Sequence, residues 1–488
     1  MKSKLPSFSI RVFTLSIVLF VAACATNPIT GKKQISLMSE AQEIQLGAEA
    51  DPQIIAQFGV YEDAELQSFL NKKGQEMADI SHRPNLKWTF RIMDSPEVNA
   101  FAVPGGYVYF TRGIMAHFNN EAEFAGVLGH EIGHVTARHS ADQYTKSTFA
   151  NLALIGGMIA SPTFRTFANE AQTAMGLLFL KYSRDNESES DGLGAEYSTK
   201  IGYDANEMAD FFKTLKALGE DAGAEIPTFF STHPDPGDRY NKVKEHAAEW
   251  QAQVPKDSYK VNRDSYLRMV DGLVYGEDPR QGYVVNDVFY HPEMKFQFPV
   301  PKNWRLLNSP SQVQMAPTDG KALMIFTIAQ GSSLQAAAQA TSQQLQLTVL
   351  NSRQITVNGL PAMEVISEQV SQDPSTGAQS SIGVQSIFIQ YSGSIFVFHG
   401  VAAAQNFNNY ESHFDRTSLG FKQLTDASKI NVVPERIKLA KVKSNGTISQ
   451  ALQAYGIPSA RHKELAILNG MEVNAQVTAG TTIKIVGK

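Results

Sequence analysis

One short segment, residues 130–134 (His-Glu-Ile-Gly-His), constrains this 488-residue chain more than any other feature. A helix cap at Asn120 precedes it, and apolar residues then recur at helical spacing. On a helix, His130 and His134 project from the same face, so both imidazoles can reach one zinc ion at about 2.0 to 2.1 Å. Glu131 is offset by one position, so it is placed to hold and deprotonate the water that the metal activates.

A catalytic zinc site needs a third protein ligand and an open position. The candidate lies in residues 183–191 (Ser-Arg-Asp-Asn-Glu-Ser-Glu-Ser-Asp), on a second predicted helix. Glu187 and Asp191 share one face of that helix, with Arg184 one turn earlier on the same stripe. We therefore expect Glu187 to bind the metal. Asp191, supported by Arg184, is expected behind the metal, where it accepts a ring N–H from a ligating histidine.

These residues resemble peptidase family M48, the zinc metalloendopeptidases that include CAAX-prenyl proteases, HtpX-type proteases and a bacterial lipoprotein branch. The resemblance covers roughly residues 27–282. Besides the two segments above, it rests on Asn27-Pro28-Ile29-Thr30-Gly31, Asn99-Ala100-Phe101-Ala102, Pro104-Gly105-Gly106 and Ser231-Thr232-His233-Pro234. The family implies a gluzincin fold in which Glu187 is the third ligand of one zinc ion per chain. Ser190 departs from the family pattern, which usually has alanine there.

Two further catalytic roles follow from the resemblance. His233 would lie near the zinc, where it either stabilises the oxyanion or occupies the open coordination position in a latent state. Arg239 matches a family arginine near the substrate or the transition state. The alternatives remain open that His233 caps a proline turn and that Arg239 pairs with a surface acid. The remaining candidates are interpreted as structural or solvent-exposed: His82, His117, His139, His246, Asp185 and Glu189.

Residues 98–103 and 107–111 alternate like strands on either side of a Pro-Gly-Gly turn, which predicts a hairpin. A sheet edge beside a zinc site can pair with an extended peptide through main-chain hydrogen bonds. We therefore expect Asn99, Ala100 and Phe101 to form the substrate edge. This predicts cleavage of unfolded or misassembled chains, and the alternative is a purely structural hairpin.

The N-terminus has the pattern of a lipoprotein signal peptide. Three cations precede residues 12–23, an apolar stretch that is too short to span a bilayer. Cys24 follows directly and resembles the acylated cysteine of a bacterial lipobox, although an ordinary secretory signal with an incidental cysteine remains open. With Ala25 next, the resemblance favours the outer membrane over the inner. We expect a periplasm-facing lipoprotein held on the membrane by its lipid anchor.

The chain is expected to be an α+β multidomain protein. The predicted parts are a signal peptide (1–23), a linker (24–38), a mainly helical gluzincin-type metallopeptidase domain with a small sheet (39–282), an antiparallel α+β domain (283–428) and a LysM-like domain (432–488). Within the first domain, helical periodicity from residue 39 to 78 is interrupted around Pro52 and Gly59. The apolar run 149–160 is interpreted as a core or surface helix.

Composition narrows the functional classes. The chain carries 43 basic and 48 acidic side chains, and this formal charge of -5 gives no indication of nucleic-acid binding. Its single cysteine excludes a disulfide framework and a thiolate-rich metal cluster. The main hypothesis is a zinc endopeptidase acting on unfolded or misassembled envelope proteins. The alternatives are a chaperone-like or peptidoglycan-binding assembly factor with a latent protease site, and a hydrolase of peptidoglycan peptides.

Overall fold

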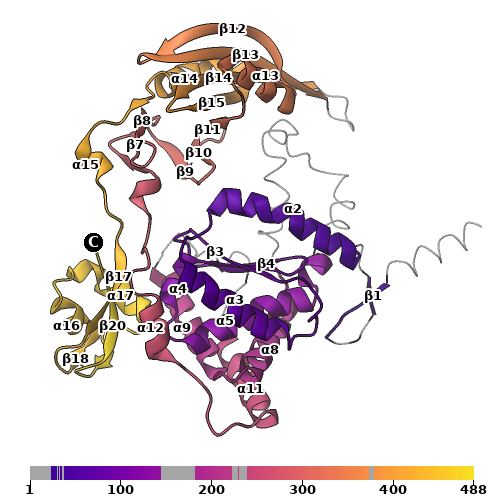
Figure 1. The fold of residues 1–488 in the computed structure, drawn as a ribbon, viewed down its shortest axis with the longest axis vertical. Coiled ribbons are helices and arrows are strands. Elements are labelled where there is room, and N and C mark those ends of the chain that lie inside the picture. Colours follow the sequence, from indigo (N-terminus) through magenta and orange to yellow (C-terminus); the bar gives the residue numbers. More distant parts are fainter. Residues whose placement is uncertain are drawn as a thin grey trace, which may run out of the picture.

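The computed structural model describes residues 24–29, 31, 33–35, 38–143, 182–221, 229, 233, 239–372 and 379–488. A mainly helical domain with a small sheet is followed by a larger antiparallel sheet domain and by a C-terminal unit that returns to the helical domain (Figure 1). This arrangement confirms the predicted α+β multidomain class. The predicted signal peptide and the apolar run 149–160 lie outside the described residues. Among the helices within the described ranges, none is long and apolar enough to cross a bilayer.

The helical domain contains the predicted metal-binding segments. Its elements are β1 (Cys24–Thr26), β2 (Lys33–Ile35), α2 (Glu40–Phe58), α3 (Ala64–Ala78), β3 (Thr89–Met93), β4 (Ala100–Val103), β5 (Tyr107–Thr111), α4 (Arg112–His117), α5 (Glu121–Thr136), α8 (Arg184–Lys200), α9 (Asn206–Asp221), α11 (Arg239–Gln253) and α12 (Arg263–Met269). The predicted interruption at Pro52 is wrong, because α2 continues through it to Gly59. Pro52 is exposed, so the carbonyl that loses its N–H partner can face solvent.

The small sheet has the order β3-β5-β4, and its strand β4 contacts α5, the helix that carries the predicted metal-binding motif. Strands β4 and β5 make the predicted hairpin, with Val103 opposite Tyr107. Phe101 and Tyr109 pack on one face against α2, whereas Ala100 and Phe110 join the main hydrophobic core on the other face. That core also contains α5, all of whose residues are buried. The predicted metal-binding motif therefore lies on a helix that is packed and buried on all of its faces.

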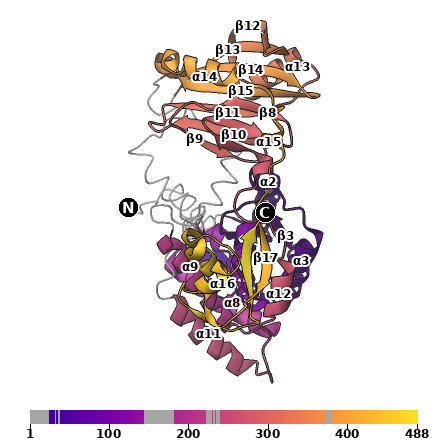
Figure 2. The same cartoon turned by 90° about the vertical axis from the view of Figure 1, so that its left-hand side faces the viewer.

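The second domain is a seven-stranded antiparallel sheet of order β12-β13-β14-β15-β11-β10-β9, with α13 packed on it (Figures 1 and 2). A smaller sheet, β16-β8-β7-β6, connects it to the helical domain. The elements are η2 (Pro279–Gln281), β6 (Tyr283–Val285), β7 (Val288–His291), β8 (Phe296–Pro299), β9 (Trp304–Asn308), β10 (Gln312–Pro317), β11 (Ala322–Ala329), α13 (Leu334–Gln344), β12 (Thr348–Val357), β13 (Leu360–Gln372), β14 (Gln379–Tyr391), β15 (Ser394–Ala403), η3 (Ala404–Asn409), α14 (Glu411–Ser418), β16 (Lys422–Gln423) and α15 (Ala427–Ile430).

The C-terminal unit packs directly on the helical domain, and apolar side chains from both parts form one hydrophobic core. Within this unit the Lys484 side chain is fully buried. Its ammonium group donates hydrogen bonds to the backbone carbonyls of Ala116 and Phe118, at 2.7 and 2.9 Å. These carbonyls lie at the C-terminal end of α4, just ahead of α5. The elements are β17 (Arg436–Lys441), β18 (Gly446–Thr447), α16 (Ile448–Gln453), η4 (Ser459–Arg461), α17 (His462–Leu468), β19 (Gln476–Val477) and β20 (Thr482–Gly487).

Candidate metal centre

Helices α5 and α8 approach each other closely because glycines line their contact. A Cβ added to Gly194 would lie 2.9 Å from the carbonyl oxygen of Gly126 and 3.2 Å from the amide nitrogen of His130. A Cβ on Gly129 would lie 3.0 Å from the Cα of Gly194. This close approach sets Glu187 of α8 opposite the two histidines of α5.

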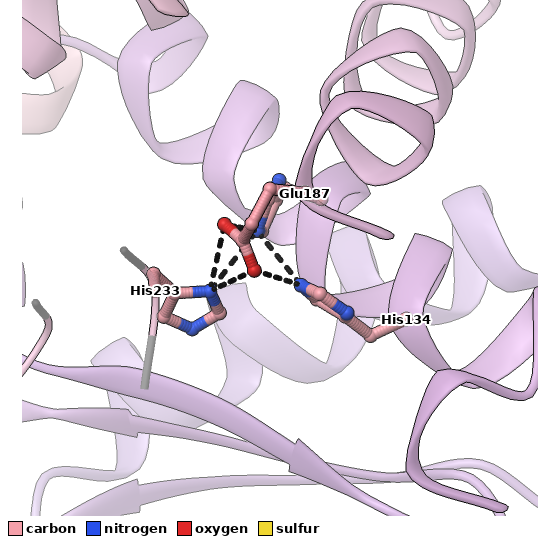
Figure 3. A group of neighbouring side chains, drawn as sticks. His134, Glu187 and His233 are labelled. Carbon is pink, nitrogen blue, oxygen red and sulfur yellow. Dashed lines mark hydrogen bonds and ion pairs between the residues drawn. The ribbon is translucent and has the colours of Figure 1, made fainter. Parts of the chain in front are cut away.

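Four buried side chains converge at this contact: His130, His134, Glu187 and His233 (Figure 3 labels the last three). The Nε2 atoms of His130 and His134 are 3.0 Å apart. The Glu187 carboxylate lies 3.7 Å from His130 Nε2 and 3.5 Å from His134 Nε2. His233 Nδ1 lies 3.1 Å from Glu187 Oε1 and 3.4 Å from His130 Nε2.

The spacing of these atoms fits a tetrahedral cation. A zinc ion held at about 2.0 to 2.1 Å from each ligand separates its ligand atoms by about 3.3 Å. The observed separations of 3.0 to 3.7 Å bracket that value. Two imidazoles and a carboxylate are also the donor types that zinc prefers. The group can therefore hold a divalent metal ion, with His233 beside it as a fourth donor.

Glu131 lies next to this group with an uncommitted carboxylate. It is fully buried, and among the described residues neither of its side-chain oxygens has a hydrogen-bond partner. The closest ionic contact runs from Glu131 Oε1 to His233 Nε2, at 3.6 Å. A buried carboxylate without a partner is costly unless a cation or a polar ligand faces it.

Asp191 and Arg239 support the metal group from behind. Asp191 Oδ1 accepts from His130 Nδ1 at 2.9 Å, which leaves His130 Nε2 free to face a metal. The Arg239 guanidinium donates to Asp191 at 2.6 and 2.8 Å and packs over the Phe212 ring. Its Nη1 atom lies 2.9 Å from Glu187 Oε2, close enough for an ion pair but not aligned for a hydrogen bond. Arg239 therefore contacts both Glu187, a predicted metal ligand, and Asp191, which orients His130.

The prediction for Arg184 is corrected by the structure. Its side chain is exposed in the first turn of α8 rather than lying beside Asp191. Arg184 is the first residue of α8, about two turns before Asp191. The cation that pairs with Asp191 comes instead from α11, where Arg239 is the first residue.

His139 and Glu189, interpreted from sequence as structural and solvated, form a second support. His139 is buried, and its Nδ1 atom lies 3.0 Å from His134 Nδ1. Glu189 Oε2 lies 3.0 Å from His139 Nε2. If Glu189 accepts the Nε2 proton of His139, then His139 Nδ1 can accept from His134, whose Nε2 lone pair is left facing the metal group. Ser190 also places its hydroxyl 3.2 Å from His139 Nδ1.

Burial and neighbouring charges set the protonation of the group. Burial raises the pKa of Glu131, against the opposing effect of His233 and His130. Burial lowers the pKa of His134, and the surrounding cations lower it further. Burial acts to raise the pKa of Glu187, but the positive charges of His233 and Arg239, with a hydrogen bond from His233, together lower it. The site thus combines an ionised carboxylate and a neutral imidazole, the forms that bind a metal, with a second carboxylate whose pKa is raised.

Aromatic side chains pack against the group. Aromatic rings cover two of its histidines: Tyr182 stacks on His134 with ring centroids 3.9 Å apart, and Phe229 stacks on His233 at 4.4 Å. Strand β4, which contains Ala100 and Phe101 of the predicted substrate edge and directly follows Asn99, pairs with β5 alone among the described strands. Asn99, Ala100 and Phe101 are nevertheless buried.

Residues 64–247 match the sequence profile of peptidase family M48. Mitochondrial metalloendopeptidase OMA1 of Arabidopsis thaliana is 32% identical over 208 residues, which are 42% of this chain and 40% of that protein. A putative beta-barrel assembly-enhancing protease of Vibrio cholerae is 33% identical over 199 residues, 39% of this chain and 41% of that protein. The beta-barrel assembly-enhancing protease of Escherichia coli is 28% identical over 260 residues, 51% of this chain and 52% of that protein. The chain spans about half or less of the length of these curated relatives.

Proposed function

Residues 64–247 of this chain belong to peptidase family M48 and form a metallopeptidase domain, and from that premise we propose a zinc-dependent endopeptidase of the bacterial envelope. Its proposed substrates are unfolded or misassembled envelope proteins, in keeping with the relatives that are named beta-barrel assembly-enhancing proteases. The observation that carries the proposal is the buried donor group at tetrahedral spacing beside the buried carboxylate of Glu131, whose oxygens accept no hydrogen bond within the described residues.

His130, His134 and Glu187 would hold the zinc ion. When bound, the ion would polarise the scissile carbonyl and lower the pKa of an attacking water towards about 7. Glu131 would orient that water, accept its proton and pass the proton to the leaving amine. The raised pKa of Glu131, which burial causes, suits it to accept a proton. Asp191 would keep the proton of His130 on Nδ1, and Arg239 would hold Asp191 and Glu187 in place.

The test compares hydrolysis of an unfolded protein such as casein by the wild type and by Glu131→Gln. We expect the wild type to lose activity when a chelator removes the metal and to regain it when zinc is returned. Glu131→Gln removes the base but none of the three ligands, so it should bind zinc and hydrolyse nothing. Hydrolysis by Glu131→Gln at the wild-type rate would refute the mechanism.

The position of His233 supports a second proposal, that the resting site is latent. Its Nδ1 atom belongs to the donor group and would occupy the position that water needs. A His233→Ala variant separates the two predicted roles. If His233 blocks the site, the variant should hydrolyse casein faster than the wild type. If His233 instead stabilises the oxyanion, the rate should fall, and a fall would refute latency.

For the rest of the chain, we propose a periplasm-facing lipoprotein anchored in the outer membrane through Cys24. Strand β4 would receive the substrate along Asn99, Ala100 and Phe101, which requires its edge to open. The C-terminal unit, which resembles LysM modules in sequence, would bind the glycan strands of peptidoglycan. A pull-down with purified sacculi tests that role, and absence of retention would remove it.

A further inference from the structure

A groove separates the helical domain from the sheet domain, away from the metal group. It encloses about 430 Å³ and is lined by the end of α2, the loop between β3 and β4, the linker after α12 and strands of the second domain. Phe296, Phe326 and Phe396 are buried along it. Three large apolar side chains on its lining are exposed: Met294 (37%), Leu307 (55%) and Ile328 (46%).

The walls of the groove are tied together by side chains from both domains. Gln281 Nε2 donates a hydrogen bond to Asp94 Oδ2 at 2.5 Å, and the backbone carbonyl of Gln281 accepts one from Asn308 Nδ2 at 3.0 Å. Arg112 bonds Asp94 at 2.6 Å and the carbonyl of Gly276 at 2.7 Å. These contacts connect the two domains through their linker, so the groove is part of the folded structure.

Charge complementarity identifies the kind of occupant. Glu97, Glu277 and Glu293 also line the groove and are exposed, and within the described part of the chain none of them has a cation at ion-pair distance. Asp94 already neutralises Arg112. Partial burial raises the pKa of Glu277, and Glu97 and Asp94 add to that effect against the opposing charge of Arg112. An incoming cation would relieve this repulsion, and the exposed apolar side chains would bury the rest of the ligand.

The groove also adjoins elements that can bind a polypeptide. Its wall includes Leu307 of β9, an edge strand of the seven-stranded sheet. The Glu97 carbonyl accepts from Thr111 Oγ1 at 2.5 Å, and Asn99, two residues later, begins the proposed substrate edge. A chain lying along β4 would therefore reach the groove as it passes the start of that strand.

We propose that this groove is an exosite for an extended polypeptide segment that carries both basic and apolar side chains. It would hold one part of a substrate while another part enters the metal site. The inference rests on the proposed peptidase function and adds a substrate preference to it.

The test measures binding of labelled peptides to the full chain carrying Glu131→Gln, so that no probe is cleaved. The first probe alternates lysine and leucine. In the second, glutamate replaces lysine, and in the third, serine replaces leucine. We expect the first to bind most tightly and to weaken as salt is added, because exposed charges are screened.

Two charge-matched triple variants locate the binding. The groove triple is Glu97→Gln, Glu277→Gln and Glu293→Gln. The control triple, at exposed acids outside the groove, is Glu65→Gln, Glu411→Gln and Glu472→Gln. The loss of three exposed ion pairs should weaken binding of the lysine–leucine probe to the groove triple about tenfold. The control triple should bind this probe with nearly the affinity of the parent Glu131→Gln chain.

A Leu307→Ser, Ile328→Ser variant should also weaken the same probe, because it removes exposed apolar surface from the groove. Failure of the lysine–leucine probe to bind, an equal loss in both triples or no loss in either would overturn the proposal. Casein hydrolysis is scored separately. If hydrolysis failed while peptide binding still mapped to the groove, the peptidase function would fall and the binding site would stand.

Discussion

Gly192 and Gly194 of α8 allow a matched test of whether the close contact between α8 and α5 positions Glu187. A Cβ at Gly194 would lie 2.9 Å from a backbone oxygen of α5, so Gly194→Ala must push the helices apart. Forcing an extra methyl into such a contact costs about 1 to 3 kcal/mol. At Gly192 the nearest atom to an added Cβ is 3.7 Å away, in the His246 ring. Gly192→Ala should therefore stabilise the helix by about 1 kcal/mol.

Thermal unfolding and zinc content together measure both effects. We expect Gly194→Ala to unfold at a lower temperature and to bind zinc more weakly, because Glu187 is moved away from His130 and His134. Gly192→Ala should unfold at the wild-type temperature or above and keep its zinc. If Gly194→Ala matched the wild type in both measurements, the close helix contact would not be what positions Glu187.

Other parts of the chain give three further predictions. Asp191→Asn should lower zinc affinity by about 10 to 100-fold, measured by competition with a chelator, because His130 loses the carboxylate that orients it. Lys484→Met should destabilise the fold by about 2 kcal/mol in denaturant unfolding, because two carbonyls at the end of α4 lose their donor; unchanged stability would contradict this. Burial lowers the pKa of His399 to about 4 from its ordinary 6.5. Between these pH values His399 is therefore protonated in the unfolded chain and neutral in the folded chain. The free energy of unfolding should therefore decrease as the pH drops from 6.5 to about 4. In the His399→Gln variant this decrease should be less steep.

Three of the four donors could be predicted from residue patterns because the information is local, whereas His233 follows only from the family resemblance. His130, Glu131 and His134 are fixed by one helix, and Glu187 is selected by the face that it shares with Asp191. The hairpin of β4 and β5 also follows from residue patterns and matches the structure. In each case the information lies within one or two turns or within one hairpin.

The supports of the metal group could not be predicted in the same way. Arg184 has the right spacing on α8, yet the cation beside Asp191 is Arg239, 48 residues along the chain. His139 and Glu189 carry no recognisable spacing, because they meet only when α5 and α8 pack. His139 follows His134 by five residues, but only the folded structure shows that it is buried beside His134.

The packing of the C-terminal unit is another tertiary effect. No local pattern places the Lys484 ammonium against the carbonyls of Ala116 and Phe118, which lie 368 and 366 residues earlier. The groove between the domains depends likewise on residues from both domains and their linker. Sequence periodicity identifies each element, but not which surfaces meet.

Zinc stoichiometry of purified full-length protein tests the central claim most directly, with Glu187→Ala compared with Asp185→Ala. Both positions lie in the first turn of α8, but Glu187 is buried in the donor group and Asp185 is exposed. Elemental analysis should find one zinc ion per chain in the wild type and in Asp185→Ala, and much less in Glu187→Ala. Full zinc occupancy in Glu187→Ala at matched chelator concentration would contradict the account.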